Sequence, residues 1–434
     1  MRITKSLLYI FSRIEYHGDS DMAPCRPLHQ PDIGGKSMKA FQYNGMPKVY
    51  FGENALAEAL SAELPKTGSR VMLAYGGGSL RKNGIYDEIK RLLEGAGKTV
   101  FPFGGIMPNP TYRKVQEGAR FAQENAIDFI LAAGGGSVLD CAKMISAQAK
   151  MEGDIWEAEF TKHLLPTEFI PMAAVLTASG TGSEVNDDAV ITNEDLKIKD
   201  DMVGALPAFA VLNPAYTLSV PMTQAVSGAF DSLSHCMEIY FGKPAETNLS
   251  DELNEAVMRN IICHIREMIR NPGDVSVRSE LMWDSTVAET GILKLGKETD
   301  FQNHMIEHQL GALTDCSHGQ GLAVIHPAVY RHLAGDNTEK FVRFAREVWH
   351  LAPDGRTDLE FALAGIDALA DFIREIGLPA TLTELKAGMP AGNPDPADPG
   401  ILRQVADTCI IRPGCARKLG RDEIYAILME CIGG

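Results

Sequence analysis

The sequence of 434 residues lacks a Cys-x-x-Cys pair among its eight cysteines. Scattered cysteines in a chain of this length argue against a disulfide framework and favour reduced thiols in the cytoplasm. No apolar stretch of about 20 residues occurs, so no transmembrane helix is expected. Basic residues are also few, because 41 Lys and Arg stand against 57 Asp and Glu, which leaves a formal net charge of −16. This balance argues against nucleic acid or an anionic membrane as partner, and favours a protein that handles small molecules.

The chain is long enough for two domains, since 434 residues with 45% hydrophobic side chains exceed the size of one typical domain. Residues 1–37 are interpreted as an N-terminal extension ahead of Met38, and we expect it to be disordered or loosely packed. The apolar run at 7–11 is too short for a signal peptide, and no small-residue cleavage site follows it. The extension is therefore left out of the fold prediction.

Residues 38–214 alternate short apolar runs with helical patterns. The order strand, turn, helix, strand is typical of a parallel α/β sheet. The segment is therefore predicted to be an α/β domain. Its strands are predicted at 71–75, 127–133, 169–177 and 209–212, with a helix at 112–125.

Residues 215–434 have a different character, because long segments show helical spacing and strand-like runs are scarce. The segment 388–400 is rich in Pro, Gly and Asp and is predicted to be a loop between helices. The second domain is therefore predicted to be all-helical. Its helices are predicted at 222–241, 251–270, 277–291, 302–313, 339–351, 359–376 and 422–432.

Glycine-rich turns follow three of the predicted strands, at 76–79, 134–137 and 177–184. A turn that opens into a helix offers free backbone N–H groups and the positive end of the helix dipole to an anion. Glycine lets the anion approach the backbone without a Cβ in the way. One such loop is weak evidence, because many are ordinary turns, and none fits the Gly-x-Gly-x-x-Gly pattern. Three in one sheet predict a dinucleotide site.

The first loop also bears on the choice of nucleotide. A carboxylate near the adenosine ribose favours NAD(H), because it accepts from the 2′-hydroxyl and repels a 2′-phosphate. The loop at 76–79 has no carboxylate, and Arg81 and Lys82 follow it. If this loop meets the ribose, NADP(H) is favoured. The alternative is that Arg81 and Lys82 are an ordinary solvated pair.

A second cluster of polar residues lies in the helical domain. Asp231 and His235 stand four residues apart, as do His304 and His308, so each pair shares one face of a helix. His318 follows ten residues after the second pair. A carboxylate with several imidazoles suits Fe(II) or Zn(II). Each histidine alone could be hydrogen-bonded structure, but the two clusters together predict a metal site.

The combined pattern resembles the iron-containing (group III) alcohol dehydrogenases, and most closely their NADPH-dependent butanol dehydrogenase and aldehyde reductase branch. The resemblance covers nearly everything from Met38 onward. It rests on YFGENAL at 50–56, YGGGSLRKNG at 75–84, GGIMPNPTY at 104–112, AAGGGSVLDCAK at 132–143, TASGTGSEVN at 177–186, AVLNP at 210–214, FDSLSHCMEIY at 230–240 and the histidines at 304, 308 and 318.

The resemblance implies an α/β dinucleotide-binding domain followed by an all-α metal-binding domain, as in the dehydroquinate synthase-like fold. It implies a role for individual residues as well. The implied metal ligands are Asp231, His235, His304 and His318. His308 corresponds to a histidine beside the metal that does not bind it, and is the candidate for proton transfer. The implied cofactor-binding residues are Gly76, Gly77, Gly78, Ser79, Asn109, Gly134, Gly135, Gly136, Ser137, Asp140, Thr177, Thr181, Ser183 and Lys197, with Lys199 as an alternative to Lys197.

The expected activity is hydride transfer between NADP(H) and a small primary alcohol or aldehyde, such as butanol or butanal. The metal would polarise the carbonyl as a Lewis acid, and either Fe(II) or Zn(II) would serve. A homodimer is implied by the resemblance. One departure is Glu307-His308-Gln309, where many close relatives have Gly-His-Glu. The alternatives are a lyase of the dehydroquinate synthase type, a hydroxyacid–oxoacid transhydrogenase and a non-catalytic metal-binding protein.

Overall fold

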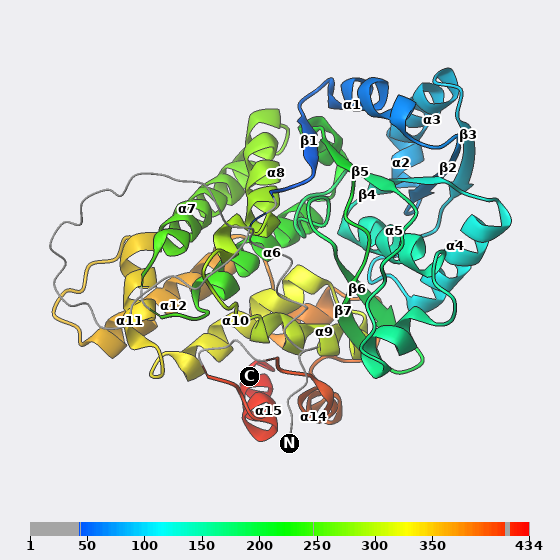
Figure 1. The fold of residues 1–434 in the computed structure, drawn as a ribbon. Helices are drawn as coiled ribbons and strands as arrows, with labels where there is room; N and C mark the ends of the chain where they lie inside the picture. The colour runs from blue at the N-terminus through cyan, green and yellow to red at the C-terminus, as the bar shows by residue number, and fades with distance from the viewer. Residues whose placement is uncertain (1–42, 44, 246, 413–416, 434) are drawn as a thin grey trace, which may run out of the picture.

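The computed structural model describes residues 43, 45–245, 247–412 and 417–433. The extension predicted at 1–37 lies outside them. Figure 1 shows two parts side by side, a sheet covered by helices at residues 48–212 and a bundle of helices that follows it. Among the described residues, no helix is long and apolar enough to cross a membrane.

The first part is built on a six-stranded sheet in which every neighbouring pair is parallel. The central strands are buried along nearly their whole length, as expected for a parallel sheet covered on both faces. The strands in spatial order are β1 (Lys48–Phe51), β8 (Phe209–Leu212), β5 (Met172–Leu176), β4 (Phe129–Gly134), β2 (Arg70–Tyr75) and β3 (Thr99–Phe103).

Helices cover the sheet on both faces, and the alternation of side chains along β2 shows how. Val71 and Leu73 pack against α1 (Ala55–Glu63) and α3 (Ile85–Gly95). Met72 and Ala74 point the other way, toward α4 (Tyr112–Glu124) and α5 (Gly136–Gln148). The sheet is therefore the middle layer of three. The short elements of this part are α2 (Ser79–Lys82), η2 (Leu64–Lys66), η3 (Glu157–Thr161) and η4 (Pro214–Ser219).

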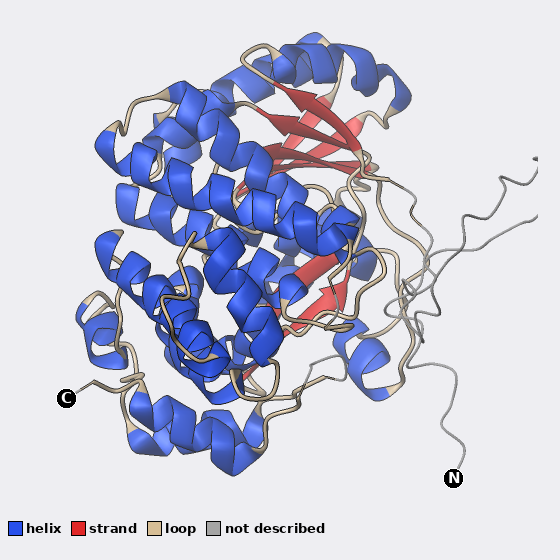
Figure 2. Ribbon diagram, turned by 90° about the vertical axis from the view of Figure 1, so that its left-hand side faces the viewer, coloured by secondary structure: helices blue, strands red, loops and turns tan. Residues whose placement is uncertain are grey.

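A separate antiparallel hairpin leaves the three layers and reaches the helical part. It consists of β6 (Asp188–Asn193) and β7 (Ile198–Val203), and Figure 2 shows it apart from the main sheet. Strand β7 packs against helix α9 (Gln302–Thr314) of the second part. The hairpin therefore brings residues of the first part close to the predicted metal ligands.

The second part is helical, and no strand of three or more residues follows β8 within the described residues. Its apolar residues form one core, with Phe230, Tyr240 and Phe344 among the largest side chains. Besides α9, its elements are α6 (Met222–Tyr240), α7 (Leu249–Arg270), α8 (Val275–Glu289), η5 (Ile292–Lys294), α10 (His318–Leu333), α11 (Thr338–Arg343), η6 (Phe344–Val348), α12 (Asp358–Glu375), α13 (Leu382–Ala387), α14 (Pro399–Thr408) and α15 (Arg421–Glu430).

The four predicted strands are present, although the one predicted at 169–177 is shorter, as β5. The seven predicted helices are present, with the one at 339–351 divided into α11 and η6. The helix predicted at 112–125 is α4. The prediction named no range for α1, α2, α3 or α5, and it missed β1, β3, the hairpin and helices α10, α13 and α14. The predicted loop at 388–400 lies between α13 and α14, although α14 already begins at Pro399.

Candidate metal centre and nucleotide-binding loops

Helix α6 supplies the first two predicted metal ligands from one face. Asp231 and His235 are both buried, and their spacing of four residues brings Nε2 of His235 within 3.8 Å of Asp231 Oδ1. The helix is long and almost entirely buried, so its packing against α7, α8 and α10 holds both side chains in place.

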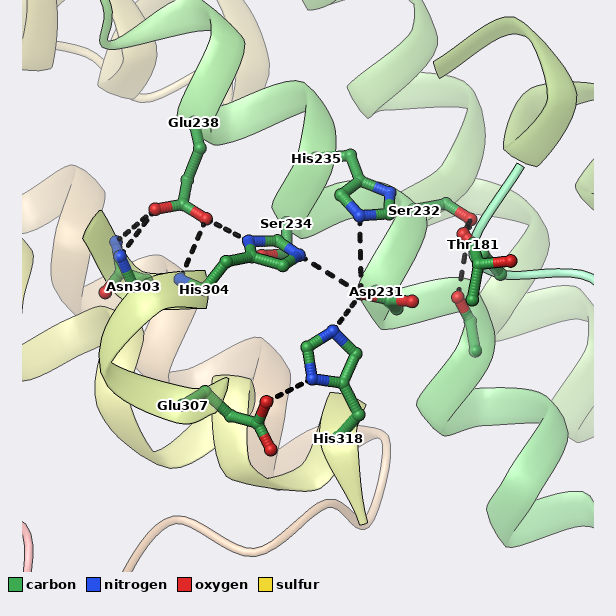
Figure 3. Close-up of polar contacts among 12 residues, drawn as sticks. Thr181, Asp231, Ser232, Ser234, His235, Glu238, Asn303, His304, Glu307 and His318 are labelled. Carbon is green, nitrogen blue, oxygen red and sulfur yellow. Dashed lines mark hydrogen bonds and ion pairs between the residues drawn. The ribbon is translucent and has the colours of Figure 1, made fainter. Parts of the chain in front are cut away.

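Helices α9 and α10 supply the other ligands from a sharp junction. Helix α9 ends at Thr314, the next residue Asp315 reverses the chain with a φ of 56°, and α10 begins at His318. Nε2 of His304 lies 3.5 Å from Asp231 Oδ1, and Nε2 of His318 lies 3.4 Å from the same atom. Figure 3 shows the imidazoles of His235, His304 and His318 converging on Asp231.

These four side chains fit a divalent metal ion. Asp231, His304 and His318 offer ligand atoms that all lie within 4.8 Å of one another. Ligands at about 2.0–2.1 Å from a tetrahedral ion are roughly 3.4 Å apart, close to the spacing found here. Asp231 Oδ1 and His304 Nε2 are buried, and no described residue satisfies either atom by a hydrogen bond. Unsatisfied buried atoms that converge on one point are what a metal site requires.

Each imidazole has a buried glutamate behind it. An imidazole that binds a metal through one nitrogen usually donates its other N–H to a carboxylate, which fixes the tautomer and the ring orientation. The Nδ1 atoms of His304 and His318 are hydrogen-bonded to carboxylates, and Nδ1 of His235 lies 3.6 Å from one. The pairs are Glu238 with His304, Glu307 with His318 and Glu289 with His235.

The electrostatics of the cluster agree with metal binding except at one residue. Burial lowers the pKa of His318 well below its ordinary value, so its imidazole is neutral and ready to be a ligand. Burial opposes the ionisation of Asp231, but the neighbouring histidines outweigh it and lower its pKa. Burial likewise disfavours the charged form of His304, but Glu238 and Asp231 together raise its pKa to about 10. A metal ion must therefore displace a proton from His304.

His308 lies beside the cluster and not in it. Its ring centroid is 5.3 Å from that of His318 and 6.0 Å from that of His304. The side chain is nearly buried, and burial lowers its pKa well below the ordinary value. A second group of possible ligands, Glu307, His308 and His318, shares His318 with the first group.

The loop at 134–137 forms the N-terminus of a long helix. Strand β4 ends at Gly134 and α5 begins at Gly136, so the first N–H groups of a 13-residue helix face outward from the sheet edge. A Cβ at Gly136 would lie 2.3 Å from Thr181 Oγ1, and one at Gly135 would lie 3.3 Å from Ala178 Cβ. These glycines therefore allow the loop at 177–184 to pack directly on the predicted pyrophosphate loop.

The loop at 76–79 is more open. No atom lies within 4 Å of a Cβ built on Gly77, and Gly77, Gly78 and Ser79 are exposed. The helix that follows, α2, has only four residues, so its dipole is small. Arg81 in this helix lies over the ring of Tyr86, 3.9 Å from the centroid, and donates to the Tyr75 hydroxyl at 2.7 Å. Arg81 is therefore held beside the loop by two aromatic rings.

Several other predicted cofactor residues contact one another. The Ser183 hydroxyl donates to Asp140 Oδ1 at 2.5 Å, and the backbone N–H of Val190 donates to Asp140 Oδ2 at 3.2 Å. Both Asp140 and Ser183 are buried, so in this structure they hold the loop at 177–184 and strand β6 in place. The N–H of Thr177 donates to Gly134 O at 2.9 Å, which joins the second and third loops.

Asn109 and Lys197 occupy positions that the sequence did not anticipate. Asn109 donates to Asp315 Oδ1 at 2.8 Å and so joins the first part of the chain to the junction before His318. Lys197 is exposed at the turn of the β6–β7 hairpin, with a φ of 59°. Lys199 is buried instead, with its Nζ 3.4 Å from Glu307 Oε2. The structure therefore brings Lys199, and not Lys197, to the metal cluster.

The sequence did not reveal that these three glutamates contact the histidines, and Glu307 was noted only as a departure from close relatives. Glu238 stands three residues after His235, and Glu307 three residues after His304, so helical spacing offered a weak signal for both. Glu289 lies at the end of α8, and nothing in the sequence near it pointed to His235.

Comparison with known proteins matches both parts of the chain to one family. The family model described as "Iron-containing alcohol dehydrogenase" matches residues 47–214, and "Fe-containing alcohol dehydrogenase family, C-terminal" matches residues 225–430. A probable NADH-dependent butanol dehydrogenase of Bacillus subtilis (strain 168) is 37% identical over 349 residues, which cover 80% of this chain and 90% of the relative. An NADPH-dependent aldehyde reductase of Escherichia coli (strain K12) is 34% identical over 351 residues, which cover 80% of this chain and 89% of the relative.

Solved structures agree with these matches. The NADH-dependent butanol dehydrogenase A of Thermotoga maritima superimposes with a TM-score of 0.84 at 31% identity, and the match covers 91% of this chain and 99% of that one. The α/β part followed by a helical part is thus the arrangement found in this family.

Proposed function

This chain belongs to the iron-containing alcohol dehydrogenase family, and we propose that it interconverts small primary alcohols and aldehydes, such as butanol and butanal, with NADP(H). One observation carries the proposal. The Nε2 atoms of three imidazoles lie within 4 Å of one oxygen of a buried carboxylate, on the helical side of a hairpin that comes from the nucleotide-binding part. Alcohol dehydrogenase and aldehyde reductase activities are those of the relatives, so the lyase alternative is not favoured.

The proposed metal ligands are Asp231, His235, His304 and His318. A divalent ion held there supplies a Lewis acid for the carbonyl oxygen of the substrate. Asp231 contributes the one negative charge of the ligand set. Glu238 and Glu307 accept from the Nδ1–H groups of His304 and His318, and so keep the Nε2 atoms of these two histidines aimed at one point. Fe(II) and Zn(II) both suit this set of donors.

The proposed nucleotide site uses the outward N–H groups at the start of α5 for the pyrophosphate. Thr177 and Thr181 border that loop on the side of the third loop. Lys199 replaces Lys197 as the proposed cofactor lysine, because Lys199 is the one that lies at the cluster. The nicotinamide supplies the hydride, and the protein aligns it with the carbonyl carbon.

His308 is the proposed proton donor to the oxygen of the reduced substrate. Its ring lies next to that of His318 without competing for Asp231. Because burial keeps its imidazole neutral, it would act by passing on a proton from solvent and not as a standing acid.

The preference for NADP(H) rests on the first loop. The loop at 76–79 offers no carboxylate to repel a 2′-phosphate, and Arg81 is held beside it by Tyr75 and Tyr86. The relatives include enzymes named for NADH and for NADPH, so the family alone does not decide. A homodimer is proposed from the resemblance.

The proposed function is tested by NADPH oxidation with butanal on protein purified without oxygen. Activity that disappears on chelation and returns with Fe(II) or Zn(II) supports the reaction and identifies a competent metal. Activity with NADH alone keeps the reaction and overturns the interpretation of the first loop. No activity with either nucleotide and either metal contradicts the proposal and favours the transhydrogenase or lyase alternatives.

A further inference from the structure

The carboxylate of Glu307 lies where the two parts of the chain meet. Its Oε2 accepts from Nδ1 of His318 and lies 3.4 Å from the Nζ of Lys199. Its Oε1 lies 3.6 Å from the Cys316 thiol, which donates to it. The side chain has no exposed surface, and that of Lys199 is 5% exposed. One carboxylate thus serves a proposed metal ligand and a lysine from the other part of the chain.

Two glycines make room for this arrangement. A Cβ at Gly321 would lie 2.9 Å from Cγ of Glu307, and a Cβ at Gly311 would lie 3.3 Å from the Nζ of Lys199. Both distances are shorter than ordinary van der Waals contact. A larger residue at either glycine would therefore crowd the Lys199–Glu307 ion pair.

The hairpin that carries Lys199 is anchored to the helical part at other points too. Arg412 donates to Asp200 and Asp201 at 2.6 Å each, and Gln309 donates to Lys197 O at 2.8 Å. With its backbone fixed on both sides, Lys199 cannot follow Glu307 by moving the strand. If the ion pair between Glu307 and Lys199 weakens or strengthens, the ammonium group of Lys199 must therefore change its direction while the strand stays in place.

Glu307 differs in this respect from Glu238. Glu238 also accepts from a proposed metal ligand, His304. Its other partners include the backbone N–H and the side-chain amide of Asn303, which lies next to His304 on α9. Both glutamates are fully buried. Glu238 therefore orients a ligand without touching the nucleotide-binding part, and is the matched control for Glu307.

We propose that Glu307 is a positioning residue that couples metal binding to nucleotide binding through Lys199, an inference that rests on the proposed metal and nucleotide sites. A cation on Nε2 of His318 makes its Nδ1–H a stronger donor, so Glu307 is drawn toward His318. The attraction of Glu307 for Lys199 then weakens, and the ammonium charge becomes available to the anionic nucleotide. By linkage, the nucleotide must tighten metal binding by the same factor.

The coupling is measured with zinc as the metal and NADPH as the nucleotide. The Kd of NADPH is determined by fluorescence on metal-free and zinc-loaded protein, and the Kd of zinc by competition with a chelator, with and without NADPH. In the wild type we expect zinc to tighten NADPH binding by about 5-fold or more, and NADPH to tighten zinc binding equally. Glu307→Gln is expected to weaken zinc binding and to reduce the coupling to about 1-fold.

Glu238→Gln is expected to weaken zinc binding by about 10- to 100-fold while keeping the wild-type coupling. Lys199→Met removes the other partner of the Lys199–Glu307 ion pair. This variant should abolish the coupling while zinc still binds. If Glu307→Gln does not fold, the coupling measured in Lys199→Met tests the proposal.

The outcomes separate two failures. Wild-type protein that binds no zinc contradicts the proposed metal site, and wild-type protein that binds no NADPH contradicts the proposed preference for NADP(H), so either result counts against the proposals on which the inference rests. Wild-type protein that binds both without mutual effect overturns the inference alone. The inference is also overturned if Glu307→Gln or Lys199→Met retains the wild-type coupling, or if Glu238→Gln loses it as fully as they do.

Discussion

Replacing Gly136 with alanine should separate the two loops proposed to hold the nucleotide. The new Cβ would lie 2.3 Å from Oγ1 and 2.6 Å from Cγ2 of Thr181, distances that no real Cβ contact tolerates. Gly136 begins α5, whose residues are buried almost throughout, so the helix cannot move aside. The loop at 177–184 must yield instead. Overpacking of this kind typically costs about 1–3 kcal/mol.

The first glycine-rich loop offers a control. Gly77 belongs to a loop with the same Gly-Gly-Gly-Ser sequence, but a Cβ there would meet nothing within 4 Å. We expect Gly77→Ala to leave the thermal midpoint nearly unchanged. Gly136→Ala should lower it by several degrees, at roughly 2 °C per kcal/mol, and should weaken NADPH binding as well.

A second substitution tests the cause. Thr181→Ala removes the two atoms nearest to the new Cβ, so it should recover part of the loss in Gly136→Ala while giving no gain in the wild type. Thermal unfolding and NADPH fluorescence titration of the four proteins complete the cycle. Equal effects of alanine at Gly136 and Gly77, or no recovery with Thr181→Ala, would refute the reasoning.

Three further predictions follow from the site and its surroundings. His304→Ala should abolish stoichiometric zinc binding, because one of three converging imidazoles is lost. The Kd of NADPH for the metal-free protein should stay within about twofold of the wild-type value. An unchanged zinc content would contradict the assignment of His304 as a ligand. Arg81→Ser should weaken NADPH binding by about tenfold and leave NADH binding nearly unchanged, as measured by fluorescence titration. An equal effect on both nucleotides would show that Arg81 does not determine the preference for NADP(H). Burial raises the pKa of Glu159 from 4.5 to about 8, so its contribution to stability is present at low pH and is lost as the pH rises toward 8. The thermal midpoint of the wild type should therefore fall relative to that of Glu159→Gln between pH 5 and pH 9, and a constant difference would count against this.

The sequence predicted the centre of the sheet better than its edges. Strands β2, β4, β5 and β8 are nearly continuous apolar runs, because both of their faces are covered. Strands β1 and β3 lie at the edges, where polar residues and Pro102 break the pattern. The hairpin was missed because β7 carries Lys199, Asp200 and Asp201, whose charges pair with Glu307 and Arg412 of the helical part.

Helix α10 was missed for a related reason. Its sequence contains Gly319, Gly321 and Pro327, which lower the helical signal. The structure explains two of them, since a Cβ at Gly319 would lie 2.3 Å from Ser227 O and Gly321 makes room for Glu307. Residues that disfavour a helix locally are thus kept where the helix must pass close to the proposed site.

The proposed metal ligands could be predicted, whereas the residues that hold them could not. Asp231 and His235 share a helix face by spacing alone, so their proximity follows from the sequence. The part played by Glu289 depends on how α8 packs against α6, which no local pattern encodes. Lys197 and Lys199 could not be told apart either, since the choice depends on where the hairpin turns.

The glutamates behind the histidines also set the total charge that the centre will accept. Asp231, Glu238, Glu289 and Glu307 bring four carboxylates. Among the described residues, ammonium groups pair with Glu307 and Glu289 alone, Lys199 at 3.4 Å and Lys294 at 2.9 Å. With all three imidazoles neutral, two negative charges remain on these buried carboxylates. An uncompensated charge there is costly, so electroneutrality favours a doubly charged ion. A monovalent or trivalent cation would leave one unit of charge unbalanced. The protein thus selects the valence of its ion through residues that never touch it, and loss of an electron from a bound ferrous ion would work against the same balance.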